Sequence, residues 1–359
     1  MEYQNVDHHD VVRKNRQKTT IIIFITYCIL FLLGTFIDFL IQIFFYPETY
    51  HIVMSQHQYF SLYINQATPI MQSFFAYTLN VLLINPNVLI DLTPYAMMAS
   101  FLITFLFLMY SYKKVEKIMM MGLNYKECTE NDDDPDARLL FQVTEQMRLS
   151  AGMSHRPKIY LIEDNFMNAF ASGVSEKNSM VAATRVLVQD LEKLELQAVM
   201  AHEISHIKHE DIKLNITFST LSNILLLQIE VIYFILLLFR GKNSKNNNTA
   251  LLFILIFIYL IRYLLPIFSM LLSLFMSRKR EFMADAGAVS LMQNPEPMAR
   301  ALIKIDEYYK QAGNPKTNGE FMRETSYLYN PPKFSGLLST HPKTEDRLKS
   351  IGFTRKSKG

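Results

Sequence analysis

Four long apolar runs divide the chain, and polar stretches separate them. The runs extend from Ile21 to about Phe45, over about Ala96–Tyr112, over Ile216–Phe239 and over Ala250–Met276. A transmembrane helix needs roughly 20 predominantly apolar residues, with about 17 as the lower limit. The pattern therefore predicts a mostly α-helical membrane protein with four transmembrane helices, arranged as two hairpins at 19–112 and 216–276.

Basic residues orient the first hairpin. They cluster just before its first run and just after its second, at Arg13, Lys14, Arg16, Lys18, Lys113, Lys114 and Lys117. Because cytoplasmic flanks carry an excess of Lys and Arg, we expect residues 1–18 and the chain after 112 to be cytoplasmic. The loop 46–95 contains no Lys or Arg and is expected outside. Its short, polar-interrupted piece Ile70–Ile84 favours an interfacial helix over a span.

Three charges fall inside the predicted spans. Asp38 is interpreted as a snorkelling or bundle-facing carboxylate rather than a proton-transfer site. In an antiparallel second hairpin Glu230 lies near the level of Arg262, and burying either charge alone would be costly, so we expect an ion pair. Basic residues in the turn of this hairpin, 240–245, act against the assumed orientation, whereas those flanking the hairpin support it.

The stretches 113–215 and 277–359 have a soluble composition and predict one cytosolic α+β domain, with a small sheet, built from two parts of the chain. Helical spacing of apolar residues indicates a helix over Ala137–Leu149, which Gly152 is placed to stop. Short apolar runs indicate strands at Lys158–Ile162 and Met180–Ala183, and further helices are expected at Leu187–Leu191 and Leu194–Ile207.

Composition agrees with a membrane protein. Half of the 359 residues are hydrophobic, and the net charge is +3. Because the basic residues lie mostly beside apolar runs, they indicate membrane orientation and not nucleic-acid binding. The placement of the two cysteines, Cys28 and Cys128, makes a disulfide framework implausible.

The segment His202-Glu203-Ile204-Ser205-His206 carries the candidate chemistry. Positions four apart lie one turn above each other on a helix, so the two imidazoles can face one ion. In this H-E-x-x-H pattern the histidines bind zinc, and the glutamate removes a proton from a water molecule activated by the ion. The pattern predicts one Zn²⁺ per chain and makes Glu203 the catalytic base.

A catalytic zinc site needs a third protein ligand. His209 is nearest, but it would have to follow the ion along the same helix and is better explained as a solvated residue. After the fourth apolar run, Glu281 and Asp285 share one helix face. Glu281 could then bind the metal while Asp285 accepts a ring N–H from a ligating histidine.

Several ordered motifs together resemble the HtpX family of membrane zinc metalloproteases, relatives of the CAAX prenyl endopeptidases. They are His202-Glu203-x-x-His206-Ile207, Asn168-Ala169-Phe170-Ala171-Ser172-Gly173, Ser277-Arg278-x-Arg280-Glu281-Phe282-x-Ala284-Asp285, and Ser339-Thr340-His341-Pro342 followed by Arg347-Leu348. The similarity extends from about Ala137 to Ile351. The long 46–95 loop departs from the family pattern, so the N-terminal region lies outside the resemblance.

The resemblance implies a zincin-like protease domain of the gluzincin type, with His202, His206 and Glu281 as zinc ligands. It implies that Asn168, Ala169 and Phe170 border the cleft, where an extended substrate could pair as an added strand. On the same basis His341 would stabilise the oxyanion of the tetrahedral intermediate.

The expected function is that of an integral membrane zinc endopeptidase of the bacterial cytoplasmic membrane. It would hydrolyse misfolded or damaged membrane proteins, or peptides, at the cytoplasmic face, as quality control under stress. A CAAX-type prenyl-protein endopeptidase is the alternative within the class, and a small transporter using Asp38, Glu230 and Arg262 is the alternative outside it. A catalytically silent scaffold is disfavoured by the intact Glu203, and the sequence leaves the oligomeric state open.

Overall fold

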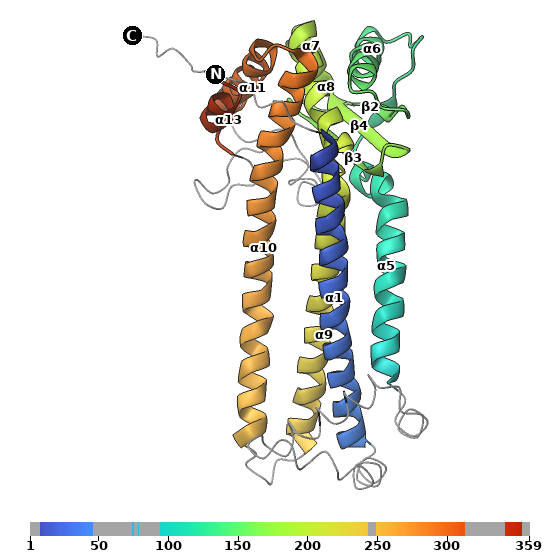
Figure 1. Ribbon diagram of the computed structural model, residues 1–359, viewed down its shortest axis with the longest axis vertical. Coiled ribbons are helices and arrows are strands. Elements are labelled where there is room, and N and C mark those ends of the chain that lie inside the picture. Colours follow the sequence, from blue (N-terminus) through green and yellow to red (C-terminus); the bar gives the residue numbers. More distant parts are fainter. Residues whose placement is uncertain are drawn as a thin grey trace. The chain divides into compact units, whose positions relative to one another are not determined.

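The computed structural model describes residues 8–45, 74, 78, 94–242, 249–312 and 342–353. The chain forms two compact units, each built from separate stretches of sequence (Figure 1). The first comprises Met1–Thr19, Tyr110–Ile216 and Met270–Gly359, and the second comprises Thr20–Met109 and Thr217–Ser269.

A four-stranded mixed sheet lies in the first unit, with strand order β1-β2-β4-β3. Its strands are β1 (Tyr125–Glu127), β2 (Lys158–Ile162), β3 (Ala169–Ser175) and β4 (Asn178–Thr184). β2 and β4 are parallel, whereas β1 pairs with β2, and β3 with β4, in antiparallel fashion. The sheet confirms the two predicted strands and adds β1 and β3, with β3 at an edge.

Among the described residues of the first unit, five shorter helices accompany the sheet. They are α6 (Pro135–Ser150), α7 (Arg185–Asp190), α8 (Lys193–Lys208), α11 (Glu296–Ala312) and α13 (Thr344–Ser350). The side chain of Asp134 caps α6, and Gly152, with φ of +67°, follows its end. α8 begins with a capping box, in which the side chains of Glu192 and Glu195 each accept from the other's backbone amide.

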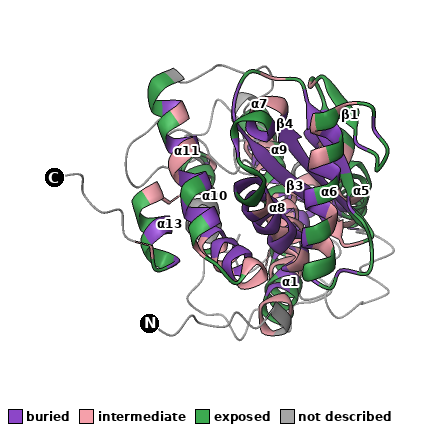
Figure 2. Cartoon of the chain, turned by 90° about the horizontal axis from the view of Figure 1, so that it is seen from above, coloured by how far each residue is buried: buried purple, intermediate pink, exposed green. Residues whose placement is uncertain are grey.

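The core of this unit is apolar and continuous over α6, the sheet, α8 and α11. α8 is buried along most of its length, unlike a surface helix with one apolar stripe (Figure 2). Its buried polar residues, such as His202, Glu203 and Ser205, are removed from water and must find partners inside the protein.

Four long helices contain the predicted apolar runs. They are α1 (His8–Phe45), α5 (Tyr95–Met120), α9 (Asp211–Lys242) and α10 (Thr249–Met292). Within the part of the chain that the structure describes, three helices are long and apolar enough to cross a membrane, over Asp10–Gln42, Tyr95–Met120 and Asp211–Leu238. The described apolar part of α10, Leu255–Ile267, is shorter than a span. α10 continues without a break from the fourth apolar run into the segment that carries Glu281.

Three charged residues of the second unit, Asp38, Glu230 and Arg262, have partners. Asp38 is buried and accepts hydrogen bonds from the backbone amides of Ala96 (2.8 Å) and Met97 (3.0 Å), so it caps the first turn of α5. The bundle-facing interpretation of this carboxylate is confirmed. Arg262 Nε lies 2.5 Å from Glu230 Oε1, which confirms the predicted ion pair.

The predictions for the cysteines and for the interfacial helix have separate outcomes. Both cysteines are free thiols, as predicted. The expected interfacial helix Ile70–Ile84 lies outside the described residues except for Phe74 and Thr78.

Candidate metal centre

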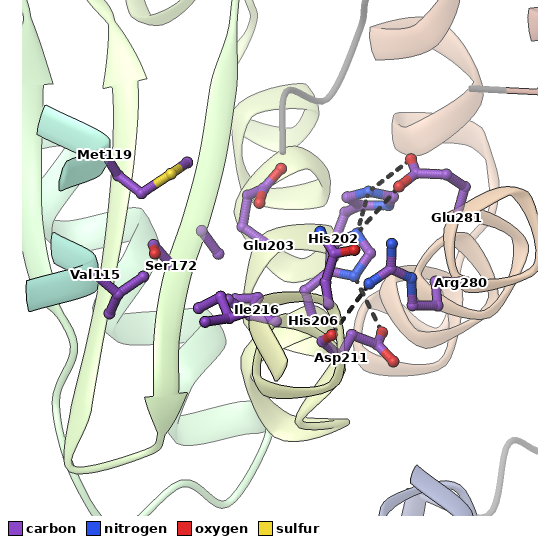
Figure 3. Close-up of a pocket in the computed structure, with 13 residues that line it drawn as sticks. Val115, Met119, Ser172, His202, Glu203, His206, Asp211, Ile216, Arg280 and Glu281 are labelled. Atoms are coloured by element: carbon purple, nitrogen blue, oxygen red, sulfur yellow. Dashed lines mark hydrogen bonds and ion pairs between the residues drawn. The ribbon is translucent and has the colours of Figure 1, made fainter. Parts of the chain in front are cut away.

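The H-E-x-x-H segment lies in the buried second half of α8. His202 and Glu203 are 0 % and 2 % exposed. His206 follows one turn later on the same helix. The two imidazole rings lie 4.8 Å apart between centroids, both on the side of α8 that faces α10 (Figure 3).

Each histidine is held at its Nδ1 atom by a carboxylate. His202 Nδ1 lies 2.9 Å from Asp285 Oδ1, and His206 Nδ1 lies 3.1 Å from Asp211 Oδ2. A carboxylate accepts and an N–H donates, so both Nδ1 atoms carry the proton. The lone pair of each neutral ring is therefore on Nε2.

The two Nε2 atoms face each other at 3.2 Å, with the carboxylate of Glu281 beside them. Glu281 Oε2 lies 3.7 Å from His202 Nε2, and Glu281 Oε1 lies 3.6 Å from His206 Nε2. Tetrahedral zinc with bonds of about 2.0 to 2.2 Å holds its ligand atoms roughly 3.4 Å apart. The three side chains, whose ligand atoms all lie within 4.8 Å of one another, therefore fit a metal ion.

Close packing of two helices brings Glu281 to the histidines. Gly287, on α10, lies against Ser205, on α8, and a Cβ atom at Gly287 would stand 2.5 Å from Ser205 Oγ and 2.9 Å from Ser205 Cβ. Such distances lie below ordinary van der Waals contact, so only glycine allows this approach. Glu281 and Gly287 are on the same helix, so the close contact also fixes the position of the carboxylate.

Asp285 is held in turn by a buried arginine. Arg347, on α13, donates from Nε to Asp285 Oδ2 at 2.8 Å and from a second guanidinium nitrogen to Oδ1 at 2.6 Å. Burial alone would raise the pKa of Asp285, but the Arg347 guanidinium keeps it below its ordinary value. Asp285 therefore stays ionised next to His202 and keeps that ring in one orientation.

Glu203 lies in a low-dielectric environment. Burial raises its pKa to about 7, the nearby charge of Glu281 acts in the same direction, and His206 opposes the shift. A backbone hydrogen bond from Ala171, in β3, also lowers the pKa of this carboxyl. A carboxyl group whose pKa lies near neutrality can both accept and return a proton.

A cavity of about 50 Å³ adjoins these groups. One wall is apolar and comes from α5 and α9: Val115, Met119, Ile212 and Ile216. The opposite side carries the two histidines, Glu203 and Glu281 (Figure 3). The cavity thus places an apolar surface next to the catalytic candidates.

The residues predicted to bind substrate are not in the cavity wall. Asn168, Ala169 and Phe170 are all buried, and the side-chain oxygen of Asn168 accepts from the backbone N–H of Ala169 at 2.9 Å. The next two residues of β3, Ala171 and Ser172, line the cavity instead. Asn168, Ala169 and Phe170 would therefore contact a substrate through their backbone groups.

Register identifies the backbone groups of β3 that face outward. Thr184 N donates to Asn168 O at 2.9 Å, so Asn168 turns its carbonyl toward β4. In an antiparallel pair the residues alternate, so Ala169 and Ala171 direct their amides and carbonyls to the open edge of β3. On that side the amide of Ala169 donates to Asn168 Oδ1, and the amide of Ala171 donates to Glu203.

The predictions for the two remaining histidines, His209 and His341, have different outcomes. The interpretation of His209 as a solvated residue is wrong: it is fully buried at the end of α8, because the chain turns there into α9. His341 lies outside the described residues.

Sequence analysis missed Asp211 altogether and gave Arg347 no role. Asp211 is separated from His206 by a turn of chain, and a helical spacing rule does not reach it. A weak signal existed for Asp211, which stands at the start of an apolar helix, where a carboxylate is favoured.

Comparison with known proteins gives a consistent result. The family model of peptidase family M48 matches residues 135–354. A protease HtpX homolog of Helicobacter acinonychis is 36% identical over 256 residues, which cover 70% of this chain and 78% of the relative. One from Dictyoglomus thermophilum is 32% identical over 263 residues, covering 73% and 82%. The crystal structure of S. mikatae Ste24p aligns with a TM-score of 0.48 at 19% identity, covering 79% of this chain and 66% of that one.

The buried H-E-x-x-H helix, the carboxylate facing it, the family-model match and the HtpX homologues define a metallopeptidase with helices of membrane-spanning length. The chain belongs to peptidase family M48, and within it to the HtpX family.

Proposed function

We propose that the chain is an integral membrane zinc endopeptidase in which His202, His206 and Glu281 hold one Zn²⁺ and Glu203 is the catalytic base. The observation that carries the proposal is the pair of Nε2 atoms facing each other at 3.2 Å, with a carboxylate oxygen 3.6 Å from one of them. Two lone pairs and a negative charge at such distances attract a cation placed between them.

Zinc, when bound, would polarise the scissile carbonyl and lower the pKa of a water molecule. Glu203 follows His202 directly and lines the same cavity, so its carboxylate can take the proton of the attacking water. The same group then donates that proton to the leaving amine. His341 is proposed to stabilise the oxyanion.

An extended substrate would bind along the open edge of β3. The outward carbonyl groups of Ala169 and Ala171 could accept hydrogen bonds from an added strand, and Asn168 and Phe170 would support that edge from within. The apolar wall of the cavity, formed by Val115, Met119, Ile212 and Ile216, favours an apolar substrate side chain beside the scissile bond.

Membrane proteins are the proposed substrates, and damaged or misfolded ones the proposed class, in quality control under stress. Both ligand-bearing segments adjoin apolar runs, since α9 begins at Asp211 and Glu281 follows the run of α10. We propose four spans, with the N-terminus and the two parts of the protease domain, 113–215 and 277–359, on the cytoplasmic side of the bacterial inner membrane.

Glu203→Gln tests the activity. The variant removes the base but keeps every proposed ligand, so it should bind one equivalent of zinc and cleave no membrane-protein substrate. Membrane proteins that accumulate with this variant, compared with wild type, identify the substrates. Full proteolysis by metal-loaded Glu203→Gln protein would contradict the assignment. Cleavage of a farnesylated CAAX peptide, but of no unmodified membrane protein, would favour the prenyl-protein alternative.

A further inference from the structure

Asn15 is a buried polar residue in a part of the chain that the family match does not reach. It lies on α1, ahead of the matched residues 135–354, and is 3 % exposed. Its neighbours on the helix, Arg13, Lys14 and Arg16, are exposed. A single buried amide among charged surface residues requires partners inside the protein.

Both partners of its amide group lie next to the candidate metal centre. Asn15 Nδ2 donates to Asp211 Oδ1 at 2.7 Å and to the carbonyl oxygen of His209 at 2.8 Å. The two protons of one amide therefore connect the end of α8 to the start of α9. This turn is the one that places Asp211 beside His206.

Asp211 uses its two oxygens in opposite directions. Oδ1 accepts from Asn15, and Oδ2 lies 3.1 Å from His206 Nδ1. Since Asp211 is only 1 % exposed, water does not replace either partner. The rotation of the carboxylate, and with it the orientation of the His206 ring, is therefore fixed from the side of α1.

The donor on Asp211 is a neutral amide, whereas the donor on Asp285 is the Arg347 guanidinium. The amide orients the Asp211 carboxylate as a neutral group, and the Arg280 guanidinium donates to the backbone carbonyl oxygen of Asp211 at 3.1 Å instead. The second carboxylate oxygen of Asp211, Oδ2, faces His206 Nδ1, and such a contact raises the basicity of the ring as a ligand.

We propose that Asn15 is a positioning residue of the metal centre, which acts through Asp211 on His206. The inference rests on the proposed metal-binding function. It also gives the cytoplasmic end of the first helix a role in the peptidase site, in addition to anchoring.

Zinc affinity, measured by competition with a chelator on the purified full chain, tests the proposal. Asp211→Asn should weaken zinc binding by about 10- to 100-fold, the usual effect of losing such a partner. Asn15→Leu removes the donor at similar size, and Asn15→Asp replaces the donor by an acceptor. Each should weaken zinc binding by about three- to tenfold and change the absorption spectrum of the Co²⁺-loaded protein. The Asn15→Leu/Asp211→Asn double variant should bind zinc no more weakly than Asp211→Asn alone.

Arg16→Ala is the matched control. Arg16 is the next residue on α1 and pairs with Glu210, 2.5 Å away, so its loss weakens the same attachment of α1 without touching Asp211. The control should lower thermal stability but leave zinc affinity and the Co²⁺ spectrum unchanged.

Each outcome has one meaning. Wild-type zinc affinity in both Asn15 variants, or additive effects in the double variant, would overturn the proposal. If Asn15→Leu does not fold, the near-isosteric Asn15→Asp decides. If wild type binds zinc no better than His202→Ala, the proposed function itself fails, and that result is separate from the Asn15 comparison.

Discussion

Gly287→Ala tests whether the close packing of α8 against α10 determines zinc affinity, because it changes the helix contact and leaves every proposed ligand in place. The added Cβ atom would lie 2.9 Å from Ser205 Cβ and 2.5 Å from Ser205 Oγ, against about 3.4 Å for ordinary contact. The serine hydroxyl can rotate away, but Ser205 Cβ cannot, so α8 and α10 must move apart by about 0.5 Å. Overpacking of this kind costs about 1 to 3 kcal/mol of stability.

The same displacement moves Glu281 away from the two histidines. Metal–ligand distances tolerate changes of roughly 0.2 Å. We therefore expect zinc affinity to fall by about tenfold or more, which corresponds to about 1.4 kcal/mol. Chelator competition measures the affinity, and thermal unfolding measures the stability.

Ser205→Gly provides both the control and the rescue. Alone, it should lower stability by about 1 kcal/mol, because glycine is unfavourable inside a helix, and leave zinc affinity unchanged. Combined with Gly287→Ala, it removes the overlapping atoms and should restore zinc affinity. Wild-type affinity in Gly287→Ala, or no recovery in the double variant, would refute the reasoning.

Two more predictions concern charges that hold the first unit together. Arg347→Met leaves the buried Asp285 carboxylate with His202 but without its guanidinium partner, and it should destabilise the protein by about 3 to 5 kcal/mol in thermal unfolding. Arg347→Lys should be intermediate, because an ammonium cannot make both bonds, and equal stability of all three proteins would contradict this. The pKa of Glu145 is lowered from 4.5 to about 2, first by its hydrogen bond to Arg148, so its contribution is present above pH 4.5 and lost as pH falls toward 2. Between pH 6 and pH 3 the melting temperature of wild type should therefore fall further than that of Glu145→Gln, and parallel losses would count against the assignment.

Local periodicity was sufficient for the part of the site carried by single helices. His202 and His206 share a face because they are one turn apart, and Glu281 and Asp285 do so for the same reason. That Glu281 lies beside the two histidines was expected on the basis of the family resemblance, because no spacing rule connects positions so distant in sequence.

Asp285 was predicted from its spacing to Glu281, but the other supporting residues could not be predicted from local pattern. Asn15 and Asp211 become neighbours only when α1 and the turn after α8 come together, and nothing in either segment signals the other. β3 was missed because its alanine, serine and glycine residues have weak strand propensity, so the strand depends on pairing with β4. His209 was misjudged because a charged neighbourhood in sequence does not reveal burial in the fold.

In the second unit, the cost of burying an isolated charge was enough to predict that the charged residues are paired or face inward. Asp38, Glu230 and Arg262 were each expected to have a partner or an inward orientation, since an isolated charge among apolar helices is costly. The identity of the partners of Asp38, two backbone amides at the start of α5, still required the structure.

Zinc content of the purified full chain tests the central claim most directly. Metal analysis should find one zinc per wild-type chain, and Glu281→Ala and His202→Ala should each lose it while Glu203→Gln retains it. A full equivalent of zinc in the Glu281→Ala and His202→Ala proteins, or none in wild type after metal loading, would contradict the account.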